Sequence, residues 1–330
     1  MCTAFTLASK DNQHFFGRNM DLEYDFNQSV MMIPRNYKWE NVVDQSKHMT
    51  SYAMIGMGTI LFDHPMIAEA MNEKGLAVAG LNFPHYCGYE QEVIEGDVNI
   101  GPFDVALWIL SHFESVNQLK ETLETLHIID RPFNQHVPNA TLHWIVSDKE
   151  NQSIVIECVE GKMNVHDNPL GLLGNSPTFD WHMTHLNQYT MLNVQHQKPV
   201  QWLNHTLTPD GQGTGLIGLP GDVYPASRFV RAAFLKTHSQ HIENAPQTIA
   251  QVFHILGNLA MVAGSVITED DKQDLTRYSS CMWLETGVYY YWTYETIGVH
   301  AIALHNQDLE AHEIKLFEYP KGLKIYHQNQ

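Results

Sequence analysis

The apolar residues of this chain recur with two spacings, one typical of β-strands and one typical of helices. Strand-like runs or alternations occupy seven segments, at residues 2–9, 14–19, 52–58, 76–83, 141–148, 153–160 and 287–295. Two of the intervals between them predict hairpin turns, one from Lys10 to Gln13 and the other at Glu160–Gly161. Several strands are therefore expected to pair with their neighbours in the sequence, as antiparallel strands do.

Helical spacing appears in four segments, at residues 102–113, 115–126, 225–238 and 246–261. Ser115 is the predicted N-cap of the second helix, with Gln118 completing a capping box, and Pro225 is predicted to open the third. Strands and helices come in clusters and do not alternate strictly, which predicts an α+β fold with antiparallel sheets and helices packed outside them. No Pro/Ser-rich linker, internal repeat or low-complexity tract interrupts the chain, so we expect a single domain over residues 1–330.

Composition and charge narrow the range of partners. The chain is 44% hydrophobic, enough for a substantial core, and its 37 acidic against 19 basic residues give a formal charge of −18. This charge argues against a nucleic-acid groove and against an anionic membrane surface, and it favours a small-molecule partner. Nothing in the sequence calls for a cofactor or a metal.

The cysteines and the opening residues indicate the compartment. The four cysteines at positions 2, 87, 158 and 281 lie far apart without any CxxC pair, so reduced thiols are expected. Lys10 and Asp11 interrupt the first apolar stretch, and no run approaches the roughly 20 apolar residues of a membrane helix. We therefore expect a cytoplasmic protein.

Cys2 is the first residue that suggests chemistry. If Met1 is removed, Cys2 carries both a thiol and a free α-amine, and an amine with an ordinary pKa of about 7.7–8.0 can accept the thiol proton near neutral pH. A hairpin returning from Cys2 brings "GRNMD" beside the terminus, where Arg18 would favour the thiolate and Asp21 would orient the amine. The alternative is a small buried hydrophobic residue beside an ordinary ion pair.

Three further polar residues stand where elements end or begin. Asn82 and Asn175 each end a predicted strand, a position suited to stabilising an oxyanion but also to a simple turn. Arg228 lies just inside a helix start, where the helix dipole disfavours a cation, so either a functional placement or a solvated side chain is open.

Taken together, these motifs resemble one family along the whole chain. "MCTAFTL", "GRNMD", "GLNFPHY", "NSPTFDWH", "GLPGD" with "YPASRFVRAA", and "YSSCMWLETGVYYYWTY" occur in the order found in the choloylglycine hydrolase family of N-terminal-nucleophile amidases. This family includes bile salt hydrolases and penicillin V acylases. The resemblance implies an αββα sandwich and a homotetramer.

The resemblance also assigns roles to matching positions. Cys2 would be the nucleophile, Arg18 and Asp21 would tune and hold it, Asn82 and Asn175 would form the oxyanion hole, and Arg228 would complete the polar network. Gly174 departs from the pattern, because many members have threonine there, and this change is expected to loosen the strand end. Asn82 is typical of the bile salt enzymes, where many penicillin V acylases have tyrosine.

We therefore interpret the chain as an amidase of conjugated bile salts, with a penicillin V or N-acyl homoserine lactone acylase as the alternative within the family. Alternatives of another class are a catalytically silent ligand-binding protein and a redox or metal-binding thiol protein. Because both family substrates are anions, affinity is expected from an apolar pocket. Its candidate residues are Met20, Tyr24, Phe26, Phe62, Phe133, Pro138 and Leu142, each of which is equally suited to core packing. Gly211, Gln212 and Gly213 precede "GLPGD", in a segment placed by the resemblance near the leaving amino acid, where some members have Ser-Arg.

Three other features predict packing and not chemistry. His182 and His185 have i, i+3 spacing on a predicted helix but no third ligand, so we interpret them as a solvated pair. The aromatic run at residues 289–292 predicts a strand buried on both faces. The remaining cysteines, Cys87, Cys158 and Cys281, are expected to pack as small hydrophobic residues.

Overall fold

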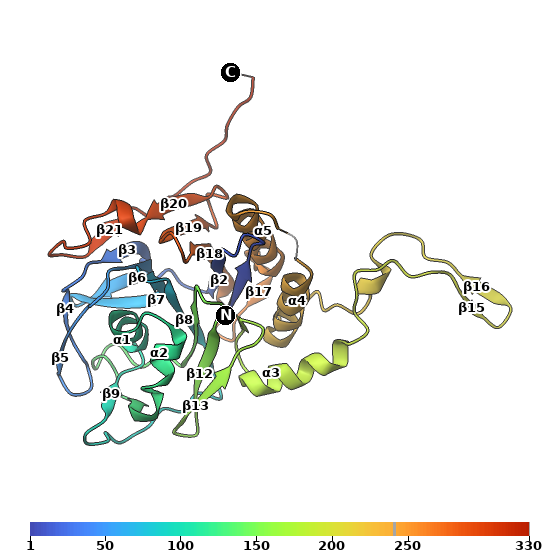
Figure 1. The fold of residues 1–330 in the computed structure, drawn as a ribbon. Helices are drawn as coiled ribbons and strands as arrows, with labels where there is room; N and C mark the ends of the chain where they lie inside the picture. Colours follow the sequence, from blue (N-terminus) through green and yellow to red (C-terminus); the bar gives the residue numbers. More distant parts are fainter. Residues whose placement is uncertain (240–241, 330) are drawn as a thin grey trace.

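Two large antiparallel β-sheets lie face to face at the centre of the protein (Figure 1), as given by a computed structural model that describes residues 1–239 and 242–329. The first sheet contains, in spatial order, β14 (Leu172–Leu173), β1 (Cys2–Ala8), β2 (His14–Leu22), β18 (Gln273–Trp283), β19 (Val288–Thr293) and β20 (His300–Ala303), with β17 (Val266–Ile267) paired to β18. The second contains β13 (Lys162–Asp167), β12 (Ser153–Val159), β11 (Leu142–Asp148), β8 (Leu76–Asn82), β7 (His64–Asn72), β6 (Met54–Leu61), β3 (Ser29–Ile33) and β21 (Lys315–Phe317).

Smaller elements complete the chain. Three two-stranded sheets pair β4 (Lys38–Glu40) with β5 (Lys47–Met49), β9 (Val98–Ile100) with β10 (Leu126–Ile128), and β15 (Val200–Trp202) with β16 (His205–Leu207). The α-helices are α1 (Val105–His112), α2 (Val116–Lys120), α3 (Phe179–His185), α4 (Pro225–His238) and α5 (Ala245–Leu259). Short 3₁₀ turns are η1 (Leu123–Thr125), η2 (Leu186–Tyr189), η3 (Thr214–Leu216) and η4 (Leu304–Asn306).

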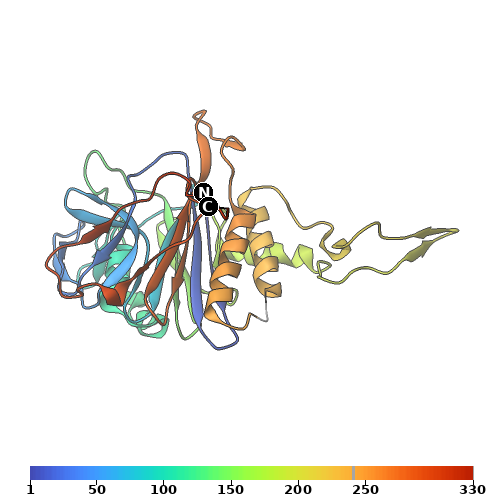
Figure 2. The ribbon, with the colours of Figure 1, turned by 90° about the horizontal axis from the view of Figure 1, so that it is seen from above.

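The layers follow the order helix, sheet, sheet, helix. Seen from above in Figure 2, α4 and α5 cover the outer face of the first sheet, while α1 and α2 lie outside the second. One apolar core fills the space between the sheets and reaches under α4 and α5, and a second core joins the second sheet to α1. The αββα sandwich and the α+β class are thus confirmed. The central strands of both sheets are covered on both faces, which explains why most predicted strands are nearly continuous apolar runs, whereas β13, β20 and β21 at the sheet edges are partly exposed.

Most predicted elements are present, with three local differences. The helix predicted over residues 115–126 is shorter, because α2 ends at Lys120 and β10 begins at Leu126. The turn at Glu160–Gly161 has both residues at positive φ, as a tight hairpin turn requires, and Pro225 opens α4. Ser115 caps α2 by accepting from the Gln118 main-chain N–H, but the Gln118 side chain accepts from Glu114 N–H, so the reciprocal capping box is not formed. In the aromatic run Tyr289 and Tyr291 are buried, whereas the alternate residues on the α5 side are half-buried.

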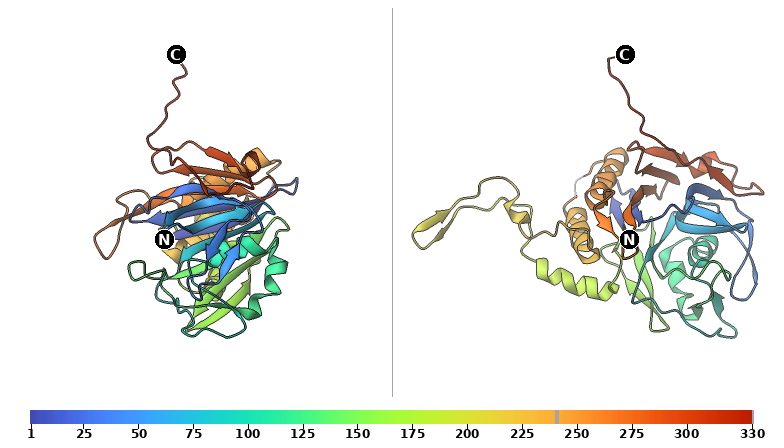
Figure 3. Two further views of the ribbon diagram at one scale, coloured as in Figure 1. Left: turned by 90° about the vertical axis from the view of Figure 1, so that its left-hand side faces the viewer. Right: turned by 180° about the vertical axis from the view of Figure 1, so that it is seen from behind.

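A long arm leaves the sandwich between α3 and α4. Figure 3 shows its hairpin, β15–β16, projecting far beyond the helices. The arm exposes large apolar side chains, with Leu203 97% and Ile217 81% accessible. The sequence pattern predicted no element here, because these short strands have exposed side chains throughout and carry no buried face. Among the described residues no helix is both long and apolar enough to cross a membrane.

Candidate active site

Cys2 is the first residue of β1, and its side chain belongs to the core between the two sheets. The β1–β2 hairpin pairs Cys2 with Met20, and the Cys2 Sγ lies 3.8 Å from the Met20 Sδ. Arg18, two residues earlier on β2, places its Nη2 3.4 Å from the same Sγ. Both side chains are buried. The hairpin predicted from the sequence therefore brings Arg18 onto the thiol.

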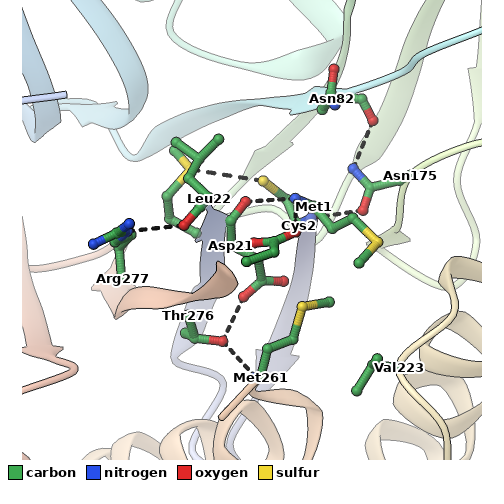
Figure 4. A network of polar contacts seen from close by, with 12 residues as sticks. Met1, Cys2, Asp21, Leu22, Asn82, Asn175, Val223, Met261, Thr276 and Arg277 are labelled. Carbon is green, nitrogen blue, oxygen red and sulfur yellow. Dashed lines mark hydrogen bonds and ion pairs between the residues drawn. The ribbon is translucent and has the colours of Figure 1, made fainter. Parts of the chain in front are cut away.

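Asn175 links the Cys2 main chain to the second sheet. Its side-chain Oδ1 accepts from the Cys2 N–H at 2.7 Å, and its Nδ2 donates to the Asn82 carbonyl oxygen at 2.6 Å (Figure 4). Asn82 meets this network through its main chain, because its side-chain Oδ1 accepts instead from Thr141 Oγ1 at 3.0 Å. The two asparagines thus lie together, but only the Asn175 side chain contacts Cys2.

Arg228 closes the network from the helix side. It is fully buried, and its Nη1 donates to the Cys2 carbonyl at 2.6 Å while its Nη2 donates to Asn175 Oδ1 at 2.7 Å. Its Nε donates to the Val223 carbonyl, which precedes α4. Burial lowers the pKa of Arg228 and the nearby carboxylate of Asp21 opposes this change. A solvated side chain, one of the two possibilities open at this helix start, is excluded.

Asp21 lies beside the amino terminus on the other face of β2. Its Oδ1 accepts from Thr276 Oγ1 at 2.6 Å, at a bulge of β18 between Thr276 and Tyr278 (Figure 4). Its Oδ2 is buried and has no hydrogen-bond partner among the described residues. The Met1 ammonium donates to the Asp21 carbonyl at 2.5 Å and lies 3.4 Å from Asp274 Oδ2. Two carboxylates therefore flank the terminus, and burial raises the pKa of Asp274 while the ammonium lowers it.

Two histidines hold the strand end that carries Asn175, and the sequence interpretation missed both. His143 Nε2 donates to the Gly174 carbonyl at 2.9 Å, and His182 Nε2 donates to the Asn175 carbonyl at 2.8 Å. His182 is buried and stacks on Phe229 at 4.5 Å, so its expected solvated role was wrong. Burial lowers its pKa to about 4. The "NSPTFDWH" motif could have predicted this contact, because it contains both Asn175 and His182 and His182 lies on the buried face of the short helix α3.

These contacts affect the consequence of glycine at position 174, where many family members have threonine. A Cβ built on Gly174 would lie 3.6 Å from the Phe229 ring, an ordinary contact, so the backbone there has room for a side chain. The imidazoles of His143 and His182 donate to the carbonyls of Gly174 and Asn175 and so restrain the backbone here. The loosening expected from glycine is therefore countered by hydrogen bonds to two successive carbonyls.

The candidate pocket residues fall into three groups. Met20 touches the thiol, and Phe26 and Leu142 pack against the cores, with Leu142 opposite Asn82 in the β8–β11 ladder. Phe62 is 68% exposed and stacks on Phe133 at 6.2 Å beside a cavity of about 430 Å³ that Cys2 does not line. Tyr24 and Pro138 are exposed. Partial burial, followed by the charges of Glu23 and Cys2, raises the pKa of the Tyr24 phenol.

Residues 211–213 lie apart from this network. They follow β16 in the arm and are exposed, and a Cβ on Gly211 would meet no atom within 4 Å. No hydrogen bond found within the described ranges joins them to Cys2, Asn175 or Arg228. Nor does any group of three His, Cys, Asp or Glu residues in those ranges have the arrangement of a metal site.

The comparisons with known proteins agree with this geometry. The sequence profile of the linear amide C–N hydrolases, choloylglycine hydrolase family, matches residues 2–317. A bile salt hydrolase/transferase of Clostridium perfringens is 49% identical over 329 residues, covering all of both chains. The crystal structure of the C2A mutant of a conjugated bile acid hydrolase from the same organism superimposes with a TM-score of 0.94 at 48% identity, covering all of both chains. A penicillin V acylase from Agrobacterium tumefaciens shares the fold, with a TM-score of 0.76 at 23% identity over 96% of this chain and 90% of its own.

Proposed function

Because the chain belongs to the choloylglycine hydrolase family of linear amide C–N hydrolases, we propose that it hydrolyses conjugated bile salts to free bile acid and glycine or taurine. The observation that carries this proposal is the full-length identity of 49% to a protein named as a bile salt hydrolase/transferase. The buried Cys2–Asn175–Arg228 network supports an amidase centre at the same place. We extend the proposal to a single catalytic domain over residues 1–330.

The proposed reaction begins with removal of Met1, which converts the Cys2 amide into a free α-amine. The amine takes the thiol proton, and the thiolate attacks the substrate carbonyl carbon, so that an S–C bond forms while the C=O π electrons move to oxygen. The Asn175 Nδ2, which donates to the Asn82 carbonyl in the free protein, would turn its N–H to that oxyanion, with the Asn82 main-chain N–H as the second proposed donor. Arg18 stabilises the thiolate beforehand.

Collapse of the tetrahedral intermediate then breaks the C–N bond. The proton held by the α-amine passes to the leaving nitrogen, and glycine or taurine departs, leaving a thioester on Cys2. Water, deprotonated by the same amine, attacks the thioester and releases the bile acid with the thiol restored. Asn175 Oδ1 and the free Asp21 Oδ2 are the acceptors that would orient the amine through both half-reactions.

Product detection with glycocholate, taurocholate and penicillin V under one set of conditions tests the substrate class. We expect glycine or taurine release from the bile salts at a rate well above phenoxyacetate release from penicillin V. The matched control is Cys2→Ser, whose fold is expected to be intact. Turnover of penicillin V, or of an N-acyl homoserine lactone, without turnover of either bile salt would move the chain to the alternative activity.

The non-catalytic alternatives require a different measurement. A silent binding protein would bind the bile salt without releasing product, and a redox thiol protein would show no preferred thiol. Intact mass should show loss of Met1 and one fast alkylation at Cys2, because Cys158 and Cys281 are buried and burial raises the pKa of both thiols and of the half-buried Cys87. The reduced thiols also support the proposed cytoplasmic location.

We further propose that the protein assembles as a homotetramer through its arm. The exposed apolar side chains of the β15–β16 hairpin, Trp202 and Leu203 among them, have no cover within the described part of the chain and would be unfavourable in water. Light scattering of Leu203→Glu should give a smaller species than the wild type. The control is Ile325→Glu, an equally large change in the exposed carboxyl-terminal tail. An unchanged mass for Leu203→Glu would remove the arm from the interface.

A further inference from the structure

A second buried charge lies behind the thiol, on the opposite sheet. Glu69 is on β7, fully buried, and its Oε2 lies 2.5 Å from Arg18 Nη1. The other terminal nitrogen of the same guanidinium, Nη2, lies 3.4 Å from the Cys2 Sγ. Glu69 and Cys2 therefore share one arginine, each through a different nitrogen.

We propose that Glu69 is a positioning residue for the Cys2 thiolate, because it fixes the Arg18 guanidinium between the two sheets and limits the positive charge that the sulfur experiences. The proposal rests on Cys2 being the nucleophile proposed above. It adds a charged residue of the second sheet to a centre whose other charged groups come from the first sheet and α4.

Four hydrogen-bond donors surround the Glu69 carboxylate. It accepts from Tyr278 at 2.8 Å, from Tyr289 at 2.6 Å and from Ser280 at 3.1 Å, in addition to Arg18. Burial, followed by the charge of Glu69, raises the pKa of both tyrosines well above the ordinary value, so each phenol remains a neutral donor. A carboxylate with four donors has no proton to give and is not itself positioned to act as an acid.

Arg18 is equally constrained. Its Nη1 also donates to the Ala68 carbonyl at 2.6 Å, and its Nη2 to the Gly80 carbonyl at 2.7 Å, both on the second sheet. Burial by itself would lower the pKa of Arg18, but the negative charges of Glu69 and Cys2 raise it above the ordinary value. The Arg18 guanidinium is therefore held in one place, where it interacts with both the Glu69 carboxylate and the Cys2 sulfur.

The charge balance around Cys2 has further members. Arg228 from α4, Tyr24 from the loop after β2 and Tyr278 from β18 interact electrostatically with the thiol. Asp21 and Asp274 flank the neighbouring amino terminus. Of these groups only Tyr278 contacts the Glu69 carboxylate, as a neutral donor. Removal of the Glu69 charge therefore acts on Cys2 chiefly through Arg18 and leaves the other charged groups in place.

This arrangement predicts the sign of the effect. In Glu69→Gln the Arg18 charge loses its permanent counter-ion, so the thiolate becomes the only anion in contact with it. The pH at half-maximal alkylation of Cys2 by iodoacetamide should fall by about one unit, a change of the size that a nearby charge produces. The kcat should fall about tenfold or more, because a more stabilised thiolate is a weaker nucleophile and Arg18 is less firmly held.

The matched control is Glu73→Gln, which also removes a glutamate paired with an arginine, Arg35, at the end of the same strand. Its alkylation midpoint should equal that of the wild type. An unchanged or raised midpoint in folded Glu69→Gln would overturn the proposal and leave Glu69 a purely structural residue. Alkylation uses no bile salt, so this result stands apart from the outcome of the substrate test.

Glu69→Asp provides the second variant if the glutamine protein does not fold. The charge is kept but the carboxylate is one methylene shorter, so the alkylation midpoint should stay near that of the wild type. The kcat should fall at least about fivefold with KM unchanged, because Arg18 is displaced while the substrate pocket is not. A Glu69→Asp enzyme with wild-type kcat would also contradict the positioning role.

Discussion

Asn175→Ala removes three hydrogen bonds at once, and the structure separates their effects. The lost Nδ2 donor is the group proposed to stabilise the oxyanion, and the loss of one such donor costs about 10²–10³ in kcat, or roughly 2.7–4 kcal/mol. The lost Oδ1 leaves the Cys2 N–H and Arg228 Nη2 without this acceptor in a buried site. At about 1–3 kcal/mol for each buried unsatisfied donor, the unfolding free energy should fall by roughly 2–6 kcal/mol.

Two variants distinguish catalysis from stability. Asn175→Asp keeps an oxygen for Cys2 and Arg228 but replaces the donor with an acceptor, so we expect the loss of kcat with a smaller loss of stability. Asn82→Ala keeps the main-chain carbonyl that Asn175 contacts and removes only the bond to Thr141, so its kcat should change less than about tenfold.

The assay combines release of glycine or taurine at saturating substrate with denaturant unfolding of each variant. Fractions of folded protein must be equal before kcat values are compared. A folded Asn175→Ala enzyme within tenfold of the wild type would refute the oxyanion role and return Asn175 to the function of a turn residue. A large loss of kcat in Asn82→Ala would show that the Asn82 side chain, and not its main chain, takes part in catalysis.

Three further outcomes are expected. His182 has a folded-state pKa of about 4, below the ordinary value near 6.5, so the unfolded chain binds the proton first as the pH falls. The unfolding free energy should therefore decrease between about pH 6.5 and pH 4, by up to about 3 kcal/mol. In His182→Gln the unfolding free energy should depend less on pH, and an unchanged dependence would contradict the lowered pKa of His182. Cys2→Ser should fold but be nearly inactive. Enzyme that retains Met1, or whose Cys2 α-amine is blocked, should also be inactive, as measured by activity assays on samples of known intact mass. Wild-type turnover by a blocked chain would exclude the α-amine as the base. The family resemblance places residues 211–213 near the leaving amino acid, where they offer no cation for a planar carboxylate, so taurocholate should be used at least as well as glycocholate and Gln212→Arg should shift kcat/KM toward glycocholate. Because the structure places these residues in the exposed arm, an unchanged ratio in Gln212→Arg, or a wild-type preference for glycocholate of about tenfold, near 1.4 kcal/mol, would show that this loop does not set the preference.

The part of the site that the sequence predicted depends on local pairing. Cys2, Arg18 and Asp21 belong to one hairpin, so the turn at Lys10–Gln13 and the strand period of two residues are enough to bring them to one end of the sheet. The unfavourable place of Arg228 in a helix drew attention to it but left a functional and a solvated side chain both open, and only the family resemblance assigned it a role; its burial in the structure excludes the solvated one. Both arguments require only neighbours along the chain.

Glu69 and His182 could not be found in this way. Glu69 meets Arg18 across 51 positions and Tyr289 across 220, and strand alternation shows that a residue points inward without showing which residue of the facing sheet it meets. His182 was interpreted from its spacing to His185, whereas its role depends on the Asn175 carbonyl and on Phe229 from another helix. The arm was missed because its strands have no buried face to produce a pattern.

The contacts of the amino terminus also limit when Met1 can be removed. In the folded chain the Met1 ammonium is held at the Asp21 carbonyl, and the bond to be cut is the Met1–Cys2 amide, whose N–H is held by Asn175, 173 positions away. The Cys2 carbonyl is fixed by Arg228, 226 positions away. Until those residues leave the ribosome, the terminus is open to an aminopeptidase. At about 5–20 residues per second this interval lasts roughly 10 to 45 s. Removal of Met1 therefore competes with synthesis and folding of the rest of the chain. We expect faster translation to yield a larger fraction of folded protein that still retains Met1.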